Sequence, residues 1–346
     1  MRVGVDARHL DAGRGIAVYL QGMLGALTED ELSLLVPGRA PLGPAARDLA
    51  ARPDVRVVRT RAPGRAVHGA AALTGVPTVA HLLGGDLDVV WIPALAPVAP
   101  GDVPYVVTVH DRSFEERPGD FTPYERLWHA AARPRRLAAR AGGVVTDTAA
   151  VRDELRSAWG LEHATVVAPG LRAVAPRDVP DAQYVLFVGA LEPRKDPVAL
   201  ARAASSAGVA AWFAGTGRLA DAVRAAGGRL LGRPSDAELD GLLAGALALV
   251  LPSHLEGFGF PPLEAALCGT PSIVSDLPVL RETLGDDGAL FVAPGDDSAL
   301  AAAILRLRDD AALRGATADQ AYARARAHTW ERAARELRAV LAEVAA

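Results

Sequence analysis

Two glutamates, Glu256 and Glu264, lie within the string SHLEGFGFPPLEAALCGTPSIVSD, residues 253–276. Ionised carboxylates only accept hydrogen bonds, so a pair facing one cleft suits the hydroxyl groups of a sugar or a ribose. For Glu264 alone, a solvated acid favoured by the dipole of its helix is an equally good explanation. The pair predicts a binding site for a polyol only together with the loop between the two residues.

That loop contains Gly257 and Gly259 and leads into Pro261 and Pro262, which predict a helix start, while Gly269 predicts its end. Glycines let backbone N–H groups approach a ligand closely, and a helix N-terminus adds partial positive charge. The loop therefore suits a phosphate or a sugar hydroxyl. The alternative is a simple turn.

Arg194 and Lys195 are adjacent in FVGALEPRKDP, which follows a predicted strand. Two fixed cations can stabilise a diphosphate leaving group in place of a metal ion. A solvated basic turn would carry the same dipeptide. The position after the first strand of a predicted second domain favours the phosphate site.

A third segment, WFAGTGRLA, places Gly215, Gly217 and Ala220 in the dinucleotide pattern G-x-G-x-x-A. With Glu238 as a ribose ligand, it would indicate an NAD-dependent oxidoreductase. However, the pattern follows the second strand of its domain rather than the first. Glu238 also completes a predicted capping box with Ser235 as the N-cap.

In the first half, the strand YVVTVH ends in His110, which is followed by Asp111. An apolar strand that ends in His-Asp has few structural reasons to exist, so His110 is a candidate site residue. The other histidines have no spacing that suggests a zinc site.

The string from Glu256 to Glu264 resembles the E-x7-E signature of retaining glycosyltransferases of family 4, which have the GT-B fold. The resemblance implies that Glu256 lies near the donor sugar and that Glu264 holds the ribose of the nucleotide. It also implies that Arg194 and Lys195 clamp the phosphates, and that His110 contacts the sugar.

The same resemblance extends to the glycine turns. It places Gly215 and Gly217 near the diphosphate, Gly232 and Arg233 beside the base, and Gly15 in the first loop. Gly257, Phe258 and Gly259 complete the donor-binding set. Near Gly15 the family pattern is closer to G-I-G-R-Y, and this chain departs from it at Ala17 and Val18.

The resemblance implies a hexosyltransferase that needs no metal or other cofactor, with GDP-mannose or a UDP-sugar as the expected donor. Transfer on the front face, with a phosphate oxygen helping to take the proton, is the implied mechanism. Asp86 and Asp88 form the D-x-D of the other large glycosyltransferase fold, but they precede a predicted strand instead of following one. A noncatalytic sugar-nucleotide-binding protein remains an alternative, beside the oxidoreductase.

Short β-branched runs alternate with Ala- and Leu-rich stretches along the chain, which predicts the α/β class with parallel strands. A Pro-rich stretch, residues 166–180, predicts a linker. We expect two Rossmann-like domains facing a cleft: residues 1–171 for the acceptor and 172–328 for the sugar nucleotide. The apolar spacing of residues 329–346 predicts an amphipathic helix, which the resemblance implies crosses back to the first domain.

Composition excludes several other classes. Of 346 residues, 50% are hydrophobic and 23% are charged, which is typical of a globular protein. The chain has 37 Lys and Arg against 41 Asp and Glu, so it has no overall positive charge that would attract a nucleic acid. The single cysteine fits a reducing compartment, and no signal peptide or spanning segment is expected.

The arginines of RLWHAAARPRRLAARAGG are spaced along one predicted basic segment, interrupted by Pro134. Such a segment could bind an anionic lipid or a phosphorylated acceptor, although solvated arginines explain it as well. The expected location is the cytoplasm, with or without peripheral contact with the inner face of the membrane. The acceptor could be a small molecule, a glycan or a lipid-linked sugar, and the oligomeric state cannot be read from the sequence.

Overall fold

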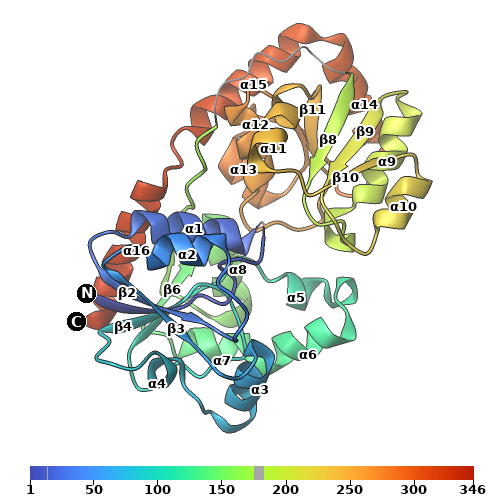
Figure 1. The fold of residues 1–346 in the computed structure, drawn as a ribbon. Coiled ribbons are helices and arrows are strands. Elements are labelled where there is room, and N and C mark those ends of the chain that lie inside the picture. The colour runs from blue at the N-terminus through green and yellow to red at the C-terminus, as the bar shows by residue number, and fades with distance from the viewer. Residues whose placement is uncertain (14, 175–182) are drawn as a thin grey trace. The chain divides into compact units, whose positions relative to one another are not determined.

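The chain folds into two units, each built around its own parallel sheet (Figure 1). The computed structural model describes residues 1–13, 15–174 and 183–346. Unit 1 comprises Met1–Gly170 and Thr329–Ala346, and unit 2 comprises Leu171–His328. The α/β class and the two Rossmann-like domains predicted from the sequence are therefore confirmed.

The sheet of unit 1 has the strand order β3-β2-β1-β4-β5-β6-β7, with every pair parallel. Its strands are β1 (Arg2–Asp6), β2 (Glu31–Val36), β3 (Val55–Arg59), β4 (Val89–Ile92), β5 (Tyr105–Thr108), β6 (Gly143–Thr146) and β7 (Ala164–Val166). Its helices are α1 (Ile16–Ala26), α2 (Pro44–Ala50), α3 (Gly64–Thr74), α4 (Val79–Leu83), α5 (Ser113–Glu116), η1 (Pro118–Asp120), α6 (Pro123–Ala132), α7 (Pro134–Ala139), α8 (Ala149–Trp159) and α16 (Trp330–Ala345).

The sheet of unit 2 has the corresponding order β10-β9-β8-β11-β12-β13. Its strands are β8 (Tyr184–Val188), β9 (Ala210–Ala214), β10 (Arg229–Gly232), β11 (Ala248–Leu251), β12 (Ser272–Ser275) and β13 (Leu290–Val292). Its helices are η2 (Pro193–Lys195), α9 (Pro197–Ser206), α10 (Ala220–Ala225), α11 (Asp236–Ala244), α12 (Phe260–Leu267), α13 (Pro278–Leu284), α14 (Asp297–Asp309) and α15 (Ala311–Ala325).

In each sheet the strand order reverses beside the first strand, between β1 and β4 in unit 1 and between β8 and β11 in unit 2. The central strands β4, β5, β6, β8, β11 and β12 are buried along their whole length, as is typical of a parallel sheet covered on both faces. Open α/β sheets bind ligands outside the carboxyl ends of the strands at such a reversal. The fold thus marks one place in each unit where a site is expected.

The strand β5 ends at Thr108, earlier than the predicted run YVVTVH, so His110 already belongs to the loop that follows the strand. The short strand β7 was not predicted, and Val166, taken as the start of the linker, is its last residue. Residues 175–180 of the predicted linker lie outside the described part of the chain.

The predicted C-terminal amphipathic helix is α16, which packs on α1 and on β4, β5 and β6 of unit 1 (Figure 1). Thr329 caps its N-terminus by accepting a hydrogen bond from the backbone N–H of Arg332. The ring of Trp330 lies where a Cβ on Gly22 would stand, only 2.1 Å from the nearest ring atom. The absence of a side chain at Gly22 therefore lets the helix dock.

Candidate active site

The loops that follow β8 and β11 meet at the point in unit 2 where the strand order reverses. The backbone N–H of His254 donates to the carbonyl of Arg194 over 2.8 Å. Lys195 Nζ donates to Glu256 Oε1 over 2.5 Å, and both side chains are largely buried, 11% and 6% exposed. The structure thus brings together two motifs that are far apart in the sequence, the basic turn and the loop of Glu256.

The basic turn is shaped by Asp196, which directly follows it. Asp196 has a φ of 44°, in the left-handed region that Asn and Asp tolerate better than most residues. Its Oδ1 accepts from the backbone N–H of Ala199 and so caps α9. The conformation and the cap therefore both favour a short polar residue at this position.

Glu264 lies on α12 and is buried, with only 4% of the residue exposed. Its Oε1 lies 3.4 Å from Nε of Arg172, which also forms an ion pair with Asp240 on α11. Burial alone would lower the pKa of the Arg172 guanidinium, but Asp240 and Glu264 outweigh burial and raise that pKa. Sequence reasoning missed Arg172 because no local motif signals its partners.

Gly215 and Gly217 serve the packing of two loops against each other. A Cβ on Gly215 would lie 1.7 Å from the carbonyl oxygen of Gly189, and one on Gly217 would lie 2.5 Å from that of Leu191. The backbone N–H of Leu191 donates to Thr216 O over 3.0 Å. These glycines hold the loop after β9 against the loop that leads to the basic turn.

Gly215→Ala is expected to lower the free energy of unfolding by about 3 kcal/mol or more, at the upper end of the range for overpacked sites. The clash is with backbone, which cannot rotate away as a side chain would. Gly315→Ala is the matched control, because a Cβ there, within α15, meets nothing within 4 Å. Urea unfolding checks the difference, and equal stability of the two variants would show that the loops can separate without cost.

Gly232 and Arg233, predicted beside the base, follow β10. Gly232 has a φ of 70°, and Arg233 Nε donates to Thr216 Oγ1 over 3.3 Å. The predicted capping box of α11 is confirmed: Ser235 accepts from the N–H of Glu238, whose carboxylate accepts from the N–H of Ser235. The hydroxyl and N–H of Ser235 hold the pKa of Glu238 below its usual value. The carboxylate suggested as an NAD ribose ligand is thus engaged in a cap.

The glycine-rich loop before α12 is anchored by Phe258, which is 3% exposed and packs edge-on against Phe260 and His328. Gly259 has a φ of 94°, and a Cβ there would lie 2.6 Å from Leu280 Cδ2. The residue at this position must therefore be glycine for two reasons, backbone conformation and space. Gly257, in the same loop, is partly exposed.

In unit 1, His110 lies just beyond β5 with both ring nitrogens engaged. Nδ1 lies 2.6 Å from Asp147 Oδ2, and Nε2 lies 2.9 Å from the carbonyl oxygen of Pro93. Burial alone would lower the pKa of the His110 imidazole, but Asp147 and the Pro93 carbonyl outweigh burial and raise it. Asp147, which directly follows β6, was missed by sequence reasoning.

The carboxyl end of β1 contributes a buried ion pair, Asp6 and Arg8, with 3.3 Å between Oδ2 and Nη1. Arg8 Nη2 also donates to the carbonyl of Ala94, which follows β4. Gly15, predicted in the first loop, precedes α1 with a φ of 77°, and a Cβ there would meet nothing within 4 Å. Tyr19 packs its ring edge-on against His110, with the ring centroids 4.7 Å apart.

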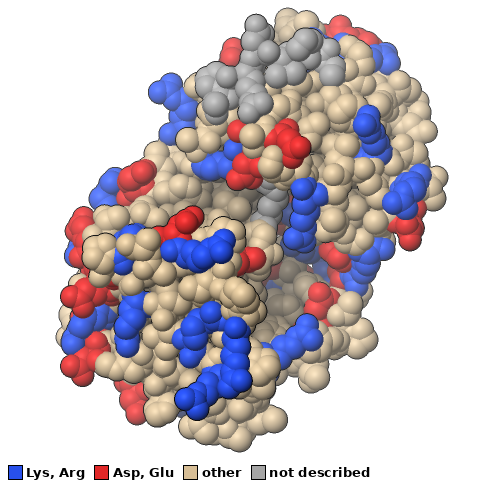
Figure 2. Space-filling model, viewed as in Figure 1, with Lys and Arg blue, Asp and Glu red and all other residues tan. Residues whose placement is uncertain are grey.

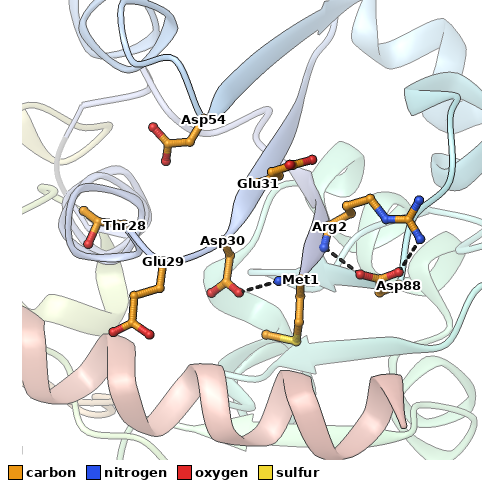
Figure 3. Close-up of a pocket in the computed structure, with 8 residues that line it drawn as sticks. All are labelled: Met1, Arg2, Thr28, Glu29, Asp30, Glu31, Asp54 and Asp88. Atoms are coloured by element: carbon orange, nitrogen blue, oxygen red, sulfur yellow. Dashed lines mark hydrogen bonds and ion pairs between the residues drawn. The ribbon is translucent and has the colours of Figure 1, made fainter.

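Asp86 and Asp88 lie at the amino end of β4, as predicted, and both pair with Arg2. Figure 3 shows the pair of Arg2 with Asp88. The two aspartates are therefore at the edge of the sheet opposite His110 and Asp147. A pocket at this edge is lined by acidic residues, among them Asp30, which accepts from the N-terminal ammonium over 2.9 Å. Among the residues that the structure describes, no three His, Cys, Asp or Glu side chains are grouped so as to hold a metal ion.

The predicted basic segment forms two helices, α6 and α7, which meet at Arg133 in a left-handed conformation before Pro134. Arg135 pairs with Glu115 over 2.9 Å. Both signs of charge occur on the face of each unit drawn in Figure 2. Contact with a lipid surface stays a prediction. Within the described ranges, no helix is both long enough and apolar enough to cross a membrane.

Two known families match consecutive parts of the chain. Residues 13–173 match the family described as Glycosyltransferase Family 4, and residues 175–324 match the family described as Glycosyl transferases group 1. The two matches meet near the junction of the two units, so each family corresponds to one Rossmann-like unit.

The chain is also similar to individual relatives and to solved structures. The chain is 40% identical to O-antigen chain mannosyltransferase B of Escherichia coli over 103 residues. The matched segment covers 30% of this chain and 27% of that protein. Over 251 residues the chain is 32% identical to glycogen synthase of Mycobacterium tuberculosis, covering 64% and 58%. The crystal structure of HepE of Anabaena with UDP and glucose has a TM-score of 0.75 at 19% identity and covers 99% of both chains. This last likeness concerns the fold.

Proposed function

We propose a reaction for this chain, which belongs to the family 4 type of glycosyltransferases with the GT-B fold. The chain moves a hexose from a nucleotide-diphosphate sugar to an acceptor hydroxyl, with retention at the anomeric carbon. The observation that carries the proposal is the meeting of the turn of Arg194 and Lys195 with the loop of Glu256 in unit 2. Cations for a leaving group and a carboxylate for a sugar are thus in one place.

Departure of the nucleoside diphosphate needs stabilisation of the charge that develops on its phosphate oxygens. Arg194 and Lys195 supply two cations on one short turn, and the left-handed Asp196 and the cap of α9 fix the end of its backbone. Preorganised charges in a partly buried site stabilise a transition state without reorganisation at the moment of reaction. We assign the diphosphate to this turn.

The two glutamates have different surroundings, which supports different roles. Glu256 lies beside Lys195 before the glycines, so its carboxylate suits positive charge that develops at the anomeric carbon. Glu264 lies within α12 against Arg172, which holds it in place for hydroxyls that do not react. We assign the sugar to Glu256 and the ribose to Glu264.

Transfer on the front face accounts for retention without an enzymic nucleophile. The acceptor oxygen bonds to the anomeric carbon on the side from which the diphosphate departs, as the bond from that carbon to the phosphate oxygen breaks. The proton of the acceptor hydroxyl passes to a phosphate oxygen of the leaving group. In unit 1, the end of β5 with His110 is our candidate for contact with the sugar.

The donor is proposed from the relatives. The E. coli relative is named a mannosyltransferase, and the HepE structure contains UDP and glucose. We therefore propose GDP-mannose or a UDP-sugar as donor. Unit 1 would bind the acceptor, which could be a small molecule, a glycan or a lipid-linked sugar.

The test is a thermal-shift screen with UDP-, GDP- and dTDP-sugars, followed by an assay for release of the nucleoside diphosphate. A ligand at about 100 times its dissociation constant stabilises the folded state by ~2.7 kcal/mol. We expect one donor to stabilise the protein and to be slowly hydrolysed, and Glu256→Gln to bind it within a few-fold but to release far less product. Binding without any release by the parent protein would indicate a noncatalytic binding protein. A shift with NADH alone would favour the oxidoreductase.

Activity is expected to persist in excess EDTA, because the cations of Arg194 and Lys195 take the place of a metal at the diphosphate. Asp86 and Asp88 are paired with Arg2 at the opposite edge of their sheet from His110. The measurement is the rate of donor turnover before and after chelation. Loss of activity in EDTA with recovery in manganese or magnesium would contradict the cation assignment.

A further inference from the structure

His254 connects the two loops of the candidate site at two points. Its backbone N–H donates to Arg194 O over 2.8 Å, and its ring Nε2 lies 3.2 Å from Asp196 Oδ2. The first contact needs only a backbone and any residue except proline could make it. The second needs this side chain. The proposed function assigns roles to two glutamates and two cations of this site, but none to His254.

Asp196 gives this second contact its importance. Its Oδ1 is used to cap α9, so Oδ2 is the oxygen left to face His254. A carboxylate beside two cations that bind a diphosphate carries the wrong sign of charge for that ligand. An N–H from His254 partly offsets this charge and fixes the side chain that ends the basic turn.

We propose that His254 is a positioning residue, which holds the turn of Arg194 and Lys195 against the loop of Glu256 through its ring contact with Asp196. This inference rests on the proposed function and adds a residue to it. The diphosphate gains charge as it leaves, so a turn that is less well positioned should slow departure more than it weakens donor binding.

The experiment compares His254→Ala, His254→Gln and His254→Asn with the parent in steady-state donor turnover. Gln can place an N–H near the position of Nε2, whereas Asn is too short to do so. We expect His254→Ala to lower kcat by about tenfold with donor KM within about threefold, which corresponds to ~1.4 kcal/mol of transition-state stabilisation. His254→Gln should recover most of kcat and His254→Asn should not. His163→Ala, an exposed histidine of unit 1, is the matched control.

A second arm repeats the His254→Ala change in an Asp196→Asn background. Asn keeps an oxygen for the cap of α9 but removes the charge, so the change should now cost less than about threefold in kcat. Urea unfolding of the parent, His254→Ala, Asp196→Asn and the double variant should show coupling between the two positions, whatever reaction the protein catalyses.

Equal cost of His254→Ala in both backgrounds, or an unchanged kcat in an active parent, would overturn this inference alone. Failure of His254→Gln to recover kcat, with unfolding midpoints equal to that of the parent, would do the same. A parent that releases no nucleoside diphosphate from any donor would overturn the proposed function, and this inference with it.

Discussion

Arg172→Met is expected to lower the free energy of unfolding by about 3–5 kcal/mol, the range for breaking a buried ion pair by removing one partner. Arg172 forms ion pairs with both Asp240 and Glu264, whose side chains are only 10% and 5% exposed. The variant would remove a cation from beside two carboxylates in a poorly solvated place. Methionine keeps the unbranched stem of the arginine side chain, so little apolar packing is lost.

The measurement is urea unfolding, with hydrogen exchange in α11 and α12 to locate the effect in unit 2. Arg202→Met is the control, because its pair with Asp297 is exposed, at 66% and 40%, and spans 3.8 Å. Such pairs contribute about 0–1 kcal/mol. If the two variants lose the same stability, the triad of Arg172, Asp240 and Glu264 is not a buried electrostatic unit.

Arg194→Ala and Lys195→Ala are each expected to lower kcat by about 100-fold or more, the scale seen when one preorganised electrostatic contact is removed. The structure distinguishes the two variants in stability. Lys195 compensates the charge of Glu256, whose side chain is 6% exposed. Lys195→Ala should therefore also lower the free energy of unfolding. Arg194→Ala should leave stability near that of the parent.

Donor turnover and urea unfolding of both variants check this expectation. Arg224→Ala is the matched control, since Arg224 is 64% exposed and pairs with a neighbouring surface acid. Near-normal turnover in both site variants would mean that the diphosphate is neutralised elsewhere. A stable Lys195→Ala protein with low activity would show that Glu256 finds another partner.

Features that depend on close neighbours in the chain were readable from the sequence. The capping box of Ser235 and Glu238, the glycine-rich loop before α12 and the face of α16 that carries Leu337 and Leu341 are each set by residues within four positions of one another. Strand positions followed from runs of apolar residues. These patterns predict local structure because a helix turn and a strand each repeat over a few residues.

Contacts between distant residues were decided by the order of strands in each sheet. Lys195 and Glu256 are 61 positions apart, and they meet because β8 lies beside β11 although two strands separate them in the chain. In the same way, β5 and β6 bring Asp147 to His110.

The family resemblance named Lys195, Glu256 and His110 as site residues, but nothing in the sequence identifies Arg172 as the partner of Glu264. An ion pair across a fold leaves no periodic signal, because either partner alone resembles a solvated charge. The sequence by itself therefore determined the fold class and the motifs. Only the tertiary structure decided which charges are buried together, since burial and pairing depend on which loops the parallel sheets bring to the same edge.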